Sequence, residues 1–101
     1  DPDDADRAMF LVEHLEVIQA ALARGIDLRG YYHWSLTDNF EWAHGFEQRF
    51  GLFRVDFEDA DLPRTRNASA DAYSDVIAAG GVTDAVRAAW VKPRYASDGR
   101  R

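Results

Sequence analysis

The sequence predicts an α/β fold for this chain of 101 residues, which is long enough for one small domain. Two observations predict this class. Apolar residues recur at helical spacing near both ends of the chain, and an aromatic-rich segment between them has the composition of a strand. The predicted order is helix, strand, irregular loop, short hairpin and helix. This mixture of helices and strands along the chain is typical of α/β proteins.

The first helical pattern covers residues 4–24. Its apolar residues recur every three or four positions, as on one buried face: Leu11, Leu15, Ile18 and Leu22. Aspartates precede it, and a helix N-terminus favours negative charge. Gly25 suits the end of the helix. We therefore expect an amphipathic helix that packs by one face.

Residues 26–36 read as a strand that lies between Gly25 and the turn cluster Thr37-Asp38-Asn39. Its two faces are both bulky: Tyr31, His33 and Ser35 on one, and Tyr32, Trp34 and Leu36 on the other. A strand with two such faces is usually covered on both sides, as in a parallel sheet between layers of helices. This short chain has little with which to cover both, so we expect natural neighbours of the strand to lie outside it.

A hairpin pattern follows the loop. Residues 52–57 alternate in the manner of a half-buried strand, with Phe53, Val55 and Phe57 on one face. Residues 62–66 are predicted to return as a second strand, which Pro63 restricts to an edge.

A second helical pattern runs from residue 70 to residue 79, and Gly80-Gly81 ends it. The residues predicted to face the core are Ala70, Tyr73 and Ile77. Thr83 could cap one further short turn that runs to Trp90.

This order of elements is compatible with the last part of a (β/α)₈ barrel, in which active-site residues follow the C-terminal ends of the strands. Trp34 and the loop after it fall at that place. The sequence begins with Asp1 and its single methionine is Met9, so we expect a fragment of a longer chain, with a trimmed independent domain as the alternative. Residues 1–91 would form the barrel segment, and residues 92–101 a basic, disordered tail.

The composition argues against several classes of function. The net charge is −6, from 18 acidic and 12 basic residues, whereas a nucleic-acid binder needs a basic face. The absence of cysteine excludes disulfides and thiolate metal sites. No apolar run approaches the roughly 20 residues of a membrane helix, and no secretory signal is visible. We therefore expect no nucleic-acid partner, no membrane partner and a cytoplasmic location.

Trp34, Glu41 and Trp42 are the candidate binding residues. Flat indole faces can stack on the CH faces of a sugar, and a carboxylate can accept hydrogen bonds from two hydroxyls at once. An aromatic core beside a surface glutamate explains the same residues, because aromatic side chains usually serve packing. The residues alone leave both interpretations open.

The sequence gives less support to other functions of this loop. Asp38, Glu41 and Glu47 could supply a general acid and base, but solvated loop acids are far commoner. Asp38 and Asn39 are better explained as residues that hold the loop through side-chain-to-backbone hydrogen bonds. Arg49 is expected to form a structural salt bridge with a loop acid. The histidines and acids of the loop lack the spacing of metal ligands, so we expect no metal site.

Several motifs occur in order along the chain: Trp34 to Trp42 (WSLTDNFEW), Gly45-Phe46, Arg49 to Leu52 (RFGL) and Val55 to Phe57 (VDF). Together they closely resemble the C-terminal region of glycoside hydrolase family 1, which contains β-glucosidases and β-galactosidases. The resemblance covers approximately residues 5–85. His33, Thr37 and the later Gly81-Val82-Thr83-Asp84 run are most similar to the archaeal-type β-glycosidases.

The resemblance implies a single-domain (β/α)₈ barrel that hydrolyses β-glycosides with retention, through a covalent glycosyl-enzyme and without metal or organic cofactor. By position, Trp34 resembles the tryptophan that lines the sugar subsite at the point of cleavage. Glu41 resembles the glutamate that accepts hydrogen bonds from the 4- and 6-hydroxyls of the sugar. Trp42 resembles the neighbouring tryptophan at the 3- and 4-hydroxyls, and Phe50 an aromatic residue in the pocket wall.

The chain departs from the family at the catalytic motifs. The family nucleophile lies in a Glu-Asn-Gly motif and the acid/base in an Asn-Glu-Pro motif, and this sequence contains neither. The resemblance therefore implies no catalytic residue in this chain, and Glu41 does not take either role.

These observations lead to one main hypothesis. The chain would be part of a retaining β-glycosidase acting on β-glucosides, β-galactosides or related oligosaccharides, and it would be inactive alone. The alternatives are a non-catalytic sugar-binding module and a piece that complements a separate barrel remainder. Archaeal-type relatives often assemble through C-terminal surfaces, so homo-oligomerisation of a full-length parent stays open.

Overall fold

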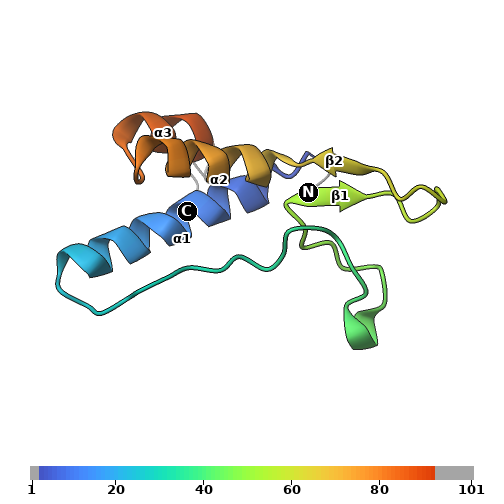
Figure 1. Cartoon of the computed structure of the whole chain (residues 1–101). Helices are drawn as coiled ribbons and strands as arrows, with labels where there is room; N and C mark the ends of the chain where they lie inside the picture. The colour runs from blue at the N-terminus through green and yellow to red at the C-terminus, as the bar shows by residue number, and fades with distance from the viewer. Residues whose placement is uncertain (1–2, 93–101) are drawn as a thin grey trace, which may run out of the picture.

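The computed structural model describes residues 3–92 of the chain. Three helices pack together, and a long loop and a small hairpin extend from them (Figure 1). In chain order the elements are α1 (Ala5–Ala23), the 3₁₀ turn η1 (Trp42–His44), β1 (Phe53–Val55), β2 (Arg64–Arg66), α2 (Ala68–Ala79) and α3 (Asp84–Trp90).

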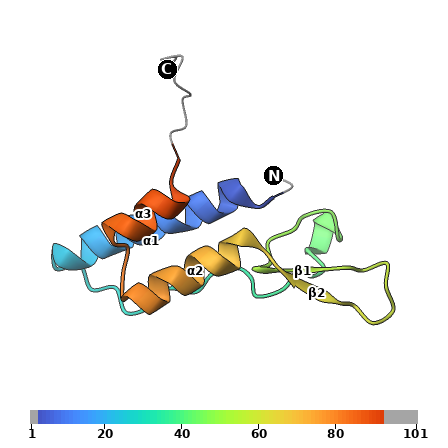
Figure 2. The ribbon, with the colours of Figure 1, turned by 90° about the horizontal axis from the view of Figure 1, so that it is seen from above.

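Two apolar clusters form the core between these elements. The first joins all three helices through Ala8, Val12, Ala72, Val76 and Val86. The second joins α1 to the start of α2 and to the residue before β1 through Leu11, Ala70 and Leu52. Figure 2 shows α1 and α2 side by side, with the hairpin continuing beyond the N-terminal end of α2. The hairpin is therefore attached to the helices through the packing of Leu52 against α1 and α2.

Helix α1 confirms the first predicted helix, with a buried face shorter than expected. Gly25 has a φ of 87°, and its N–H donates to the carbonyl of Leu22 at 3.0 Å, so the glycine ends the helix as predicted. Leu11 is fully buried, whereas Leu22 is 48% exposed. The C-terminal half of the apolar stripe therefore lacks the cover that the first half receives from α2 and α3.

Helix α2 buries a different set of residues from the one predicted. Ala70 is buried and Tyr73 is half-buried, but Ile77 is 68% exposed and was wrongly placed in the core. The helix contacts α1 and α3 through Ala72 and Val76 instead. Ile77 follows Val76 by one residue, about 100° further around the helix, and so points away from both neighbours.

The predicted strand over residues 26–36 is absent. This segment runs in an extended path beneath the helices (Figure 1), but no strand is assigned there. A strand exists only through backbone pairing with a neighbour, and within residues 3–92 pairing begins at Ser35, whose N–H donates to the Phe50 carbonyl at 2.9 Å. Leu52 and Phe53 return N–H bonds to Ser35 and Leu36, at 2.8 and 2.9 Å.

The hairpin confirms its prediction. Strands β1 and β2 pair antiparallel, with Phe53 opposite Arg66 and Val55 opposite Arg64. Thr37 adds a single parallel bridge to Phe53 on the other side of β1. The short turn predicted after Thr83 is a complete helix, α3. Thr83 caps it as predicted, because its hydroxyl accepts a hydrogen bond from the Val86 N–H at 3.2 Å.

The structure thus contains the predicted helices and hairpin but no barrel strand among its described residues. None of the helices within residues 3–92 combines the length and apolar character that a membrane crossing requires. Of the predicted tail, residues 93–101 lie outside the described residues. Lys92, the first residue of that tail, lies beside α1, where its N–H contacts the Met9 sulfur at 3.3 Å.

Candidate functional site

The candidate site is the loop of residues 34–50, which we call the site loop. Asp38 holds it in place from inside the fold. Its side chain is only 1% exposed and accepts hydrogen bonds from the Gly51 N–H at 3.0 Å and the Val55 N–H at 3.2 Å. Arg49 donates to the same carboxylate at 3.0 Å and to the Val55 carbonyl at 2.7 Å. Asp38 thereby joins the N-terminal part of the site loop to its C-terminal end and to β1.

Asn39 and Ser35 close the turn next to Asp38. The Asn39 amide donates to the Ser35 hydroxyl at 3.2 Å and to the Thr37 carbonyl at 3.1 Å. The Ser35 hydroxyl donates to the same carbonyl at 2.8 Å. The predicted roles of Asp38 and Asn39 in holding the loop are therefore confirmed, as is a salt bridge from Arg49 to a loop acid.

Gly51 is required by close packing rather than by a turn. A Cβ atom at this position would lie 2.3 Å from the Asp38 nitrogen and 2.5 Å from the Phe53 carbonyl oxygen. Both neighbours are backbone atoms, which cannot move aside as a flexible side chain can. Glycine is therefore required here so that the two backbone segments can approach closely.

Trp34 and Glu41 come together at the open side of the site loop. The indole N–H of Trp34 is shared between the two Glu41 carboxylate oxygens, at 3.3 and 3.4 Å. Trp34 is 63% exposed, so the indole presents its face to solvent while its edge is fixed by the carboxylate. The peptide bond between Trp34 and Ser35 is cis.

Trp42 begins the 3₁₀ turn η1 at the tip of the site loop, at a distance from the helices (Figure 1). It is 83% exposed and has a φ of 52°. The Glu41 N–H donates to the Gly45 carbonyl at 2.7 Å, and the His44 N–H donates to the Glu41 carbonyl at 3.0 Å. These bonds hold the turn compact while both the indole of Trp42 and the carboxylate of Glu41 stay accessible.

A small aromatic cluster packs two parts of the site loop against the residues that follow β1. Phe46 contacts Phe40 at 5.3 Å and Phe57 at 4.6 Å between ring centroids. The Arg49 guanidinium lies 5.0 Å from the Phe57 ring centroid. This cluster gives the tip of the loop an apolar support that does not use Trp34 or Trp42.

Phe50 ends the site loop, where it is 39% exposed. The Arg7 guanidinium lies 6.0 Å from the centroid of its ring. Hydrogen bonds and ring contacts within the described residues join Trp34 to Glu41, but they do not join Trp42 or Phe50 to that pair. The four predicted binding residues therefore belong to one loop, and within residues 3–92 only Trp34 and Glu41 of these four are joined to each other by side-chain hydrogen bonds.

His33 lies behind the site loop, and its buried Nε2 atom has no hydrogen-bond partner among residues 3–92. Burial is the main cause that lowers the pKa of this imidazole from its usual value of 6.5, and the nearby Arg7 charge acts in the same direction. The Phe50 backbone and Asp4 oppose this shift. The ring contacts Tyr73 edge to face at 6.5 Å. His33 therefore belongs to the packing between the loop and α2.

The alternative roles of the loop acids receive no support from this geometry. Asp38 is buried and already accepts three hydrogen bonds, while Glu47 is exposed. Across residues 3–92, no three His, Asp or Glu side chains gather in an arrangement that could hold a metal ion.

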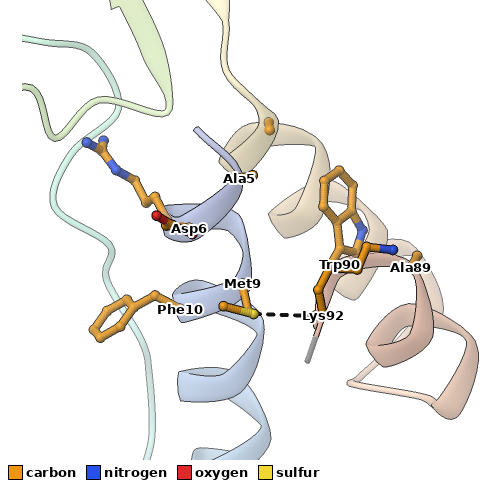
Figure 3. A pocket seen from close by; sticks show the side chains of 9 residues that line it. Ala5, Asp6, Met9, Phe10, Ala89, Trp90 and Lys92 are labelled. Atoms are coloured by element: carbon orange, nitrogen blue, oxygen red, sulfur yellow. Dashed lines mark hydrogen bonds between the residues drawn. The ribbon is translucent and has the colours of Figure 1, made fainter. Parts of the chain in front are cut away.

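A groove lies away from the site loop, between the start of α1 and the end of α3. Phe10, Met9, Trp90 and Lys92 line it together with five other residues (Figure 3). None of the predicted site residues lines this groove. The groove therefore contains none of the proposed binding residues, although one of its lining residues, Arg7, also contacts the site loop.

Arg7 is a residue that the sequence interpretation missed. Its guanidinium reaches the site loop from α1, donating to the carbonyls of Arg49 and Gly51, the latter at 3.2 Å. The available signal was weak: Arg7 is the only cation in the acidic start of the chain and lies three residues after Asp4. Helical spacing predicts their ion pair, but no local pattern predicts contacts with residues more than forty positions away.

Comparisons with known proteins place this geometry in a family. Residues 1–82 match the family described as glycosyl hydrolase family 1. Human lactase/phlorizin hydrolase is 46% identical over 81 residues, which cover 79% of this chain and 4% of that protein. A β-galactosidase of Saccharolobus solfataricus is 44% identical over 86 residues, which cover 83% of this chain and 17% of the relative.

Solved structures agree. The β-glycosidase from Pyrococcus horikoshii is 35% identical with a TM-score of 0.79, over 91% of this chain and 21% of that one. A family 1 β-glucosidase from Thermotoga maritima, solved in complex with isofagomine lactam, is 38% identical with a TM-score of 0.72, over 77% and 17%. The chain spans less than a quarter of each of these relatives. The resemblance seen in the motifs, including archaeal relatives, is confirmed.

Proposed function

Because this chain belongs to glycosyl hydrolase family 1, we propose that it supplies the glycone-binding part of a retaining β-glycosidase acting on β-glucosides or β-galactosides. Trp34, Glu41, Trp42 and Phe50 are the proposed binding residues. Neither catalytic glutamate belongs to this chain in the proposal. The 101-residue chain alone is therefore expected to bind no sugar tightly and to hydrolyse none.

The Trp34–Glu41 pair is the observation that carries the proposal. The indole N–H lies 3.3 and 3.4 Å from the two carboxylate oxygens, which orients the carboxylate beside an exposed aromatic face. A carboxylate offers about four lone-pair sites, so Glu41 keeps capacity for sugar hydroxyls after accepting this one donor. Charge-assisted hydrogen bonds of this kind are stronger than neutral ones.

Exposure of the aromatic residues supports sugar binding over a packing role within this chain. Trp34 and Trp42 are 63% and 83% exposed, so neither belongs to the core that the described residues form. Large flat side chains beside an oriented acceptor suit a pyranose ring, which has apolar CH faces and polar hydroxyl edges.

The names of similar proteins support the substrate class. The relatives include β-galactosidases and a β-glucosidase. A similar solved chain, 41% identical with a TM-score of 0.74, is described as a mutant derived from a hyperthermophilic tetrameric structure. We include homo-oligomerisation of a full-length parent in the proposal for this reason.

A chimeric enzyme tests the proposal. The matching segment of the Pyrococcus horikoshii β-glycosidase is replaced by this chain, and hydrolysis of an aryl β-glucoside is measured. We expect activity. Glu41→Gln should lower kcat/KM about 10- to 100-fold, the range that loss of a charge-assisted hydrogen bond covers. Trp42→Ala should lower kcat/KM about 10- to 100-fold through the loss of apolar contact with the sugar.

Two matched substitutions serve as controls in the chimera. Glu47→Gln removes another loop carboxylate, and Ile77→Ala truncates another exposed apolar side chain, on α2. Each should change kcat/KM less than about twofold. The proposal is contradicted if Glu41→Gln has no more effect than Glu47→Gln, or if the purified chain alone hydrolyses the substrate.

A second candidate function, complementation of a separate barrel remainder, is favoured by the extended segment. Residues 26–36 form no strand, and Tyr32, Trp34 and Leu36 on one face are 95%, 63% and 66% exposed. Such a segment offers backbone and apolar surface to a neighbouring strand. Co-expression with a host enzyme that lacks this segment should restore activity if complementation occurs.

Saturable binding of glucose to the chain alone, measured by calorimetry, would instead support a non-catalytic sugar-binding module.

A further inference from the structure

Arg7 connects the start of α1 to the end of the site loop. Its guanidinium donates from Nη1 to the Gly51 carbonyl at 3.2 Å and from Nη2 to the Arg49 carbonyl. The two acceptors flank Phe50, one residue on each side. The planar fork of an arginine can bind two acceptors at once, which the single ammonium of a lysine cannot do in the same fixed geometry.

The three successive carbonyls around Phe50 are all occupied. Those of Arg49 and Gly51 accept from Arg7, and that of Phe50 accepts from the Ser35 N–H at 2.9 Å. The Gly51 carbonyl also accepts from the Asn67 side chain at 2.8 Å. Arg7 is therefore the side chain that binds the carbonyls on both sides of Phe50, while the backbone of Ser35 binds the carbonyl of Phe50 itself.

Arg7 also contacts the aromatic ring itself. Its guanidinium carbon lies 6.0 Å from the centroid of Phe50, at the outer limit of a cation–π contact. Phe50 is 39% exposed, so part of the ring stays accessible. Arg7 thus restrains both the backbone and the ring of a residue that the proposed function places in the pocket wall.

Arg7 is in turn held by Asp4. The Arg7 Nε atom lies 3.3 Å from Asp4 Oδ1, and Asp4 Oδ2 accepts from the Ser69 N–H at 2.7 Å. Asp4 is 7% exposed and Ser69 is fully buried. The link therefore runs from the first turn of α2, through Asp4 and Arg7, to the backbone around Phe50.

We propose that Arg7 is a positioning residue for substrate binding, which sets the place of Phe50 in the glycone pocket without touching the sugar. This inference rests on the proposed function, because it takes Phe50 to line that pocket. A positioning residue of this kind should act on substrate affinity rather than on the chemical step, since both hydrolytic carboxylates are proposed to lie elsewhere.

The chimeric enzyme described above provides the test. In it, Arg7→Ala and Phe50→Ala should each raise KM about five- to tenfold with kcat changed less than about twofold, as expected when binding is lost equally in the ground and transition states. The double variant should raise KM no more than the larger single effect, because one substitution already releases the ring. Arg7→Lys keeps the charge and stem, and its KM should lie between those of the parent chimera and Arg7→Ala.

Arg87→Ala is the matched control. Like Arg7, Arg87 is an arginine that links one helix to another part of the fold. It donates from α3 to the Glu16 carboxylate of α1 at 3.0 and 3.2 Å, and this bond is not to the site loop. It should leave KM unchanged. A residue with a purely structural role would lower the fraction of folded enzyme, which lowers the apparent kcat and leaves KM unchanged.

The outcomes separate the two proposals. If Glu41→Gln and Trp42→Ala impair hydrolysis but Arg7→Ala and Arg7→Lys lower only the apparent kcat, or if the effects of Arg7→Ala and Phe50→Ala add fully, the positioning role is overturned and the proposed function stands. If Phe50→Ala alone among the site variants has no effect, its pocket role and the inference are both overturned. If no site variant matters, the proposed function itself has failed.

Discussion

At the scale of single residues, buried polar groups rather than exposed aromatics organise this site. Asp38 accepts two backbone N–H bonds and one from Arg49 while its side chain is only 1% exposed. Leaving such donors unsatisfied would cost about 1–3 kcal/mol each, so the loop is strongly tied to this one carboxylate. The exposed Trp34 and Trp42 and the half-buried Glu41 depend on that support for their placement.

His33 makes the stability of this region depend on pH. Burial lowers the pKa of its imidazole in the folded state below the usual 6.5, so the unfolded chain binds this proton more readily. The contribution to stability is fully present above about pH 6.5 and is lost as the pH falls towards the lower folded-state pKa. We expect the melting temperature of the chimera to fall more between about pH 7 and pH 5 than that of its His33→Gln variant.

His14→Gln is the control for this pH dependence, because His14 lies on α1, away from the site loop, and is exposed. The same measurement on this variant should follow the parent chimera. Identical pH profiles for the parent and His33→Gln would show that His33 does not couple protonation to folding.

At the scale of elements, short pairing between residues 35–38 and 50–53 joins the site loop to the hairpin. Ser35, Leu36 and Asp38 exchange backbone hydrogen bonds with Phe50, Leu52 and Phe53, at distances between 2.8 and 3.2 Å. Asn67, just before α2, adds a side-chain bond to the Gly51 carbonyl at 2.8 Å. Gly51 therefore lies where three segments meet.

Gly51→Ala should disrupt this junction. Its Cβ would lie 2.3 Å from one backbone atom and 2.5 Å from another, so the two segments must separate. We expect a loss of more than about 2 kcal/mol in stability, larger than for an ordinary surface substitution. Thermal unfolding of the chimera should show a clear drop in melting temperature, accompanied by loss of activity.

Gly80→Ala tests the same substitution at a glycine without a clash. Gly80 has a φ of 76° and a ψ of 13°, in the left-handed helical region, but no atom lies within 4 Å of the place that an alanine Cβ would take, so only the backbone preference opposes alanine there. This control should cost about 1 kcal/mol. Equal melting temperatures for the two variants would argue against the close-approach explanation of Gly51.

At the scale of the whole molecule, the chain buries little of its apolar surface. Large side chains such as Phe10, Val17 and Trp42 are 58%, 68% and 83% exposed. The radius of gyration is 15.7 Å, against about 13 Å for a compact chain of 100 residues. The two small core clusters therefore have a large conformational entropy to offset.

The isolated 101-residue chain should consequently show no sharp cooperative thermal transition by near-ultraviolet circular dichroism. Helical signal in the far ultraviolet is expected to persist, because α1 and α2 have local sequence support. The chimera serves as the comparison and should melt cooperatively. A cooperative melt from a chain that is monomeric by sedimentation would contradict this prediction.

The predictions from sequence succeeded where the cause is local. Gly25, Gly80 and Thr83 end or begin helices through bonds to residues a few positions away, and the structure contains each of those bonds. The hairpin follows from alternation within residues 52–57. The site motif also identified Trp34 and Glu41, which the structure brings into contact.

Failures arose where the cause is a partner elsewhere in the chain or outside it. Residues 26–36 have the composition of a strand, but within residues 3–92 backbone pairing with the hairpin side reaches only Ser35 and Leu36, at the end of this segment. Ile77 fits the helical stripe, but α1 and α3 approach α2 on another side. Periodicity states which residues share a face, whereas the neighbours decide which face is covered.

The sequence by itself determined the family, the helices and their ends, the hairpin and the loop that carries the candidate binding residues, because motifs and short-range hydrogen bonds depend on nearby residues. Only the tertiary structure decided that Asp38 is buried beneath that loop and that Gly51 admits no side chain. It alone brought Arg7 to the carbonyls around Phe50. These contacts join residues distant in sequence, and their geometry exists only once α1, the loop and β1 have packed together.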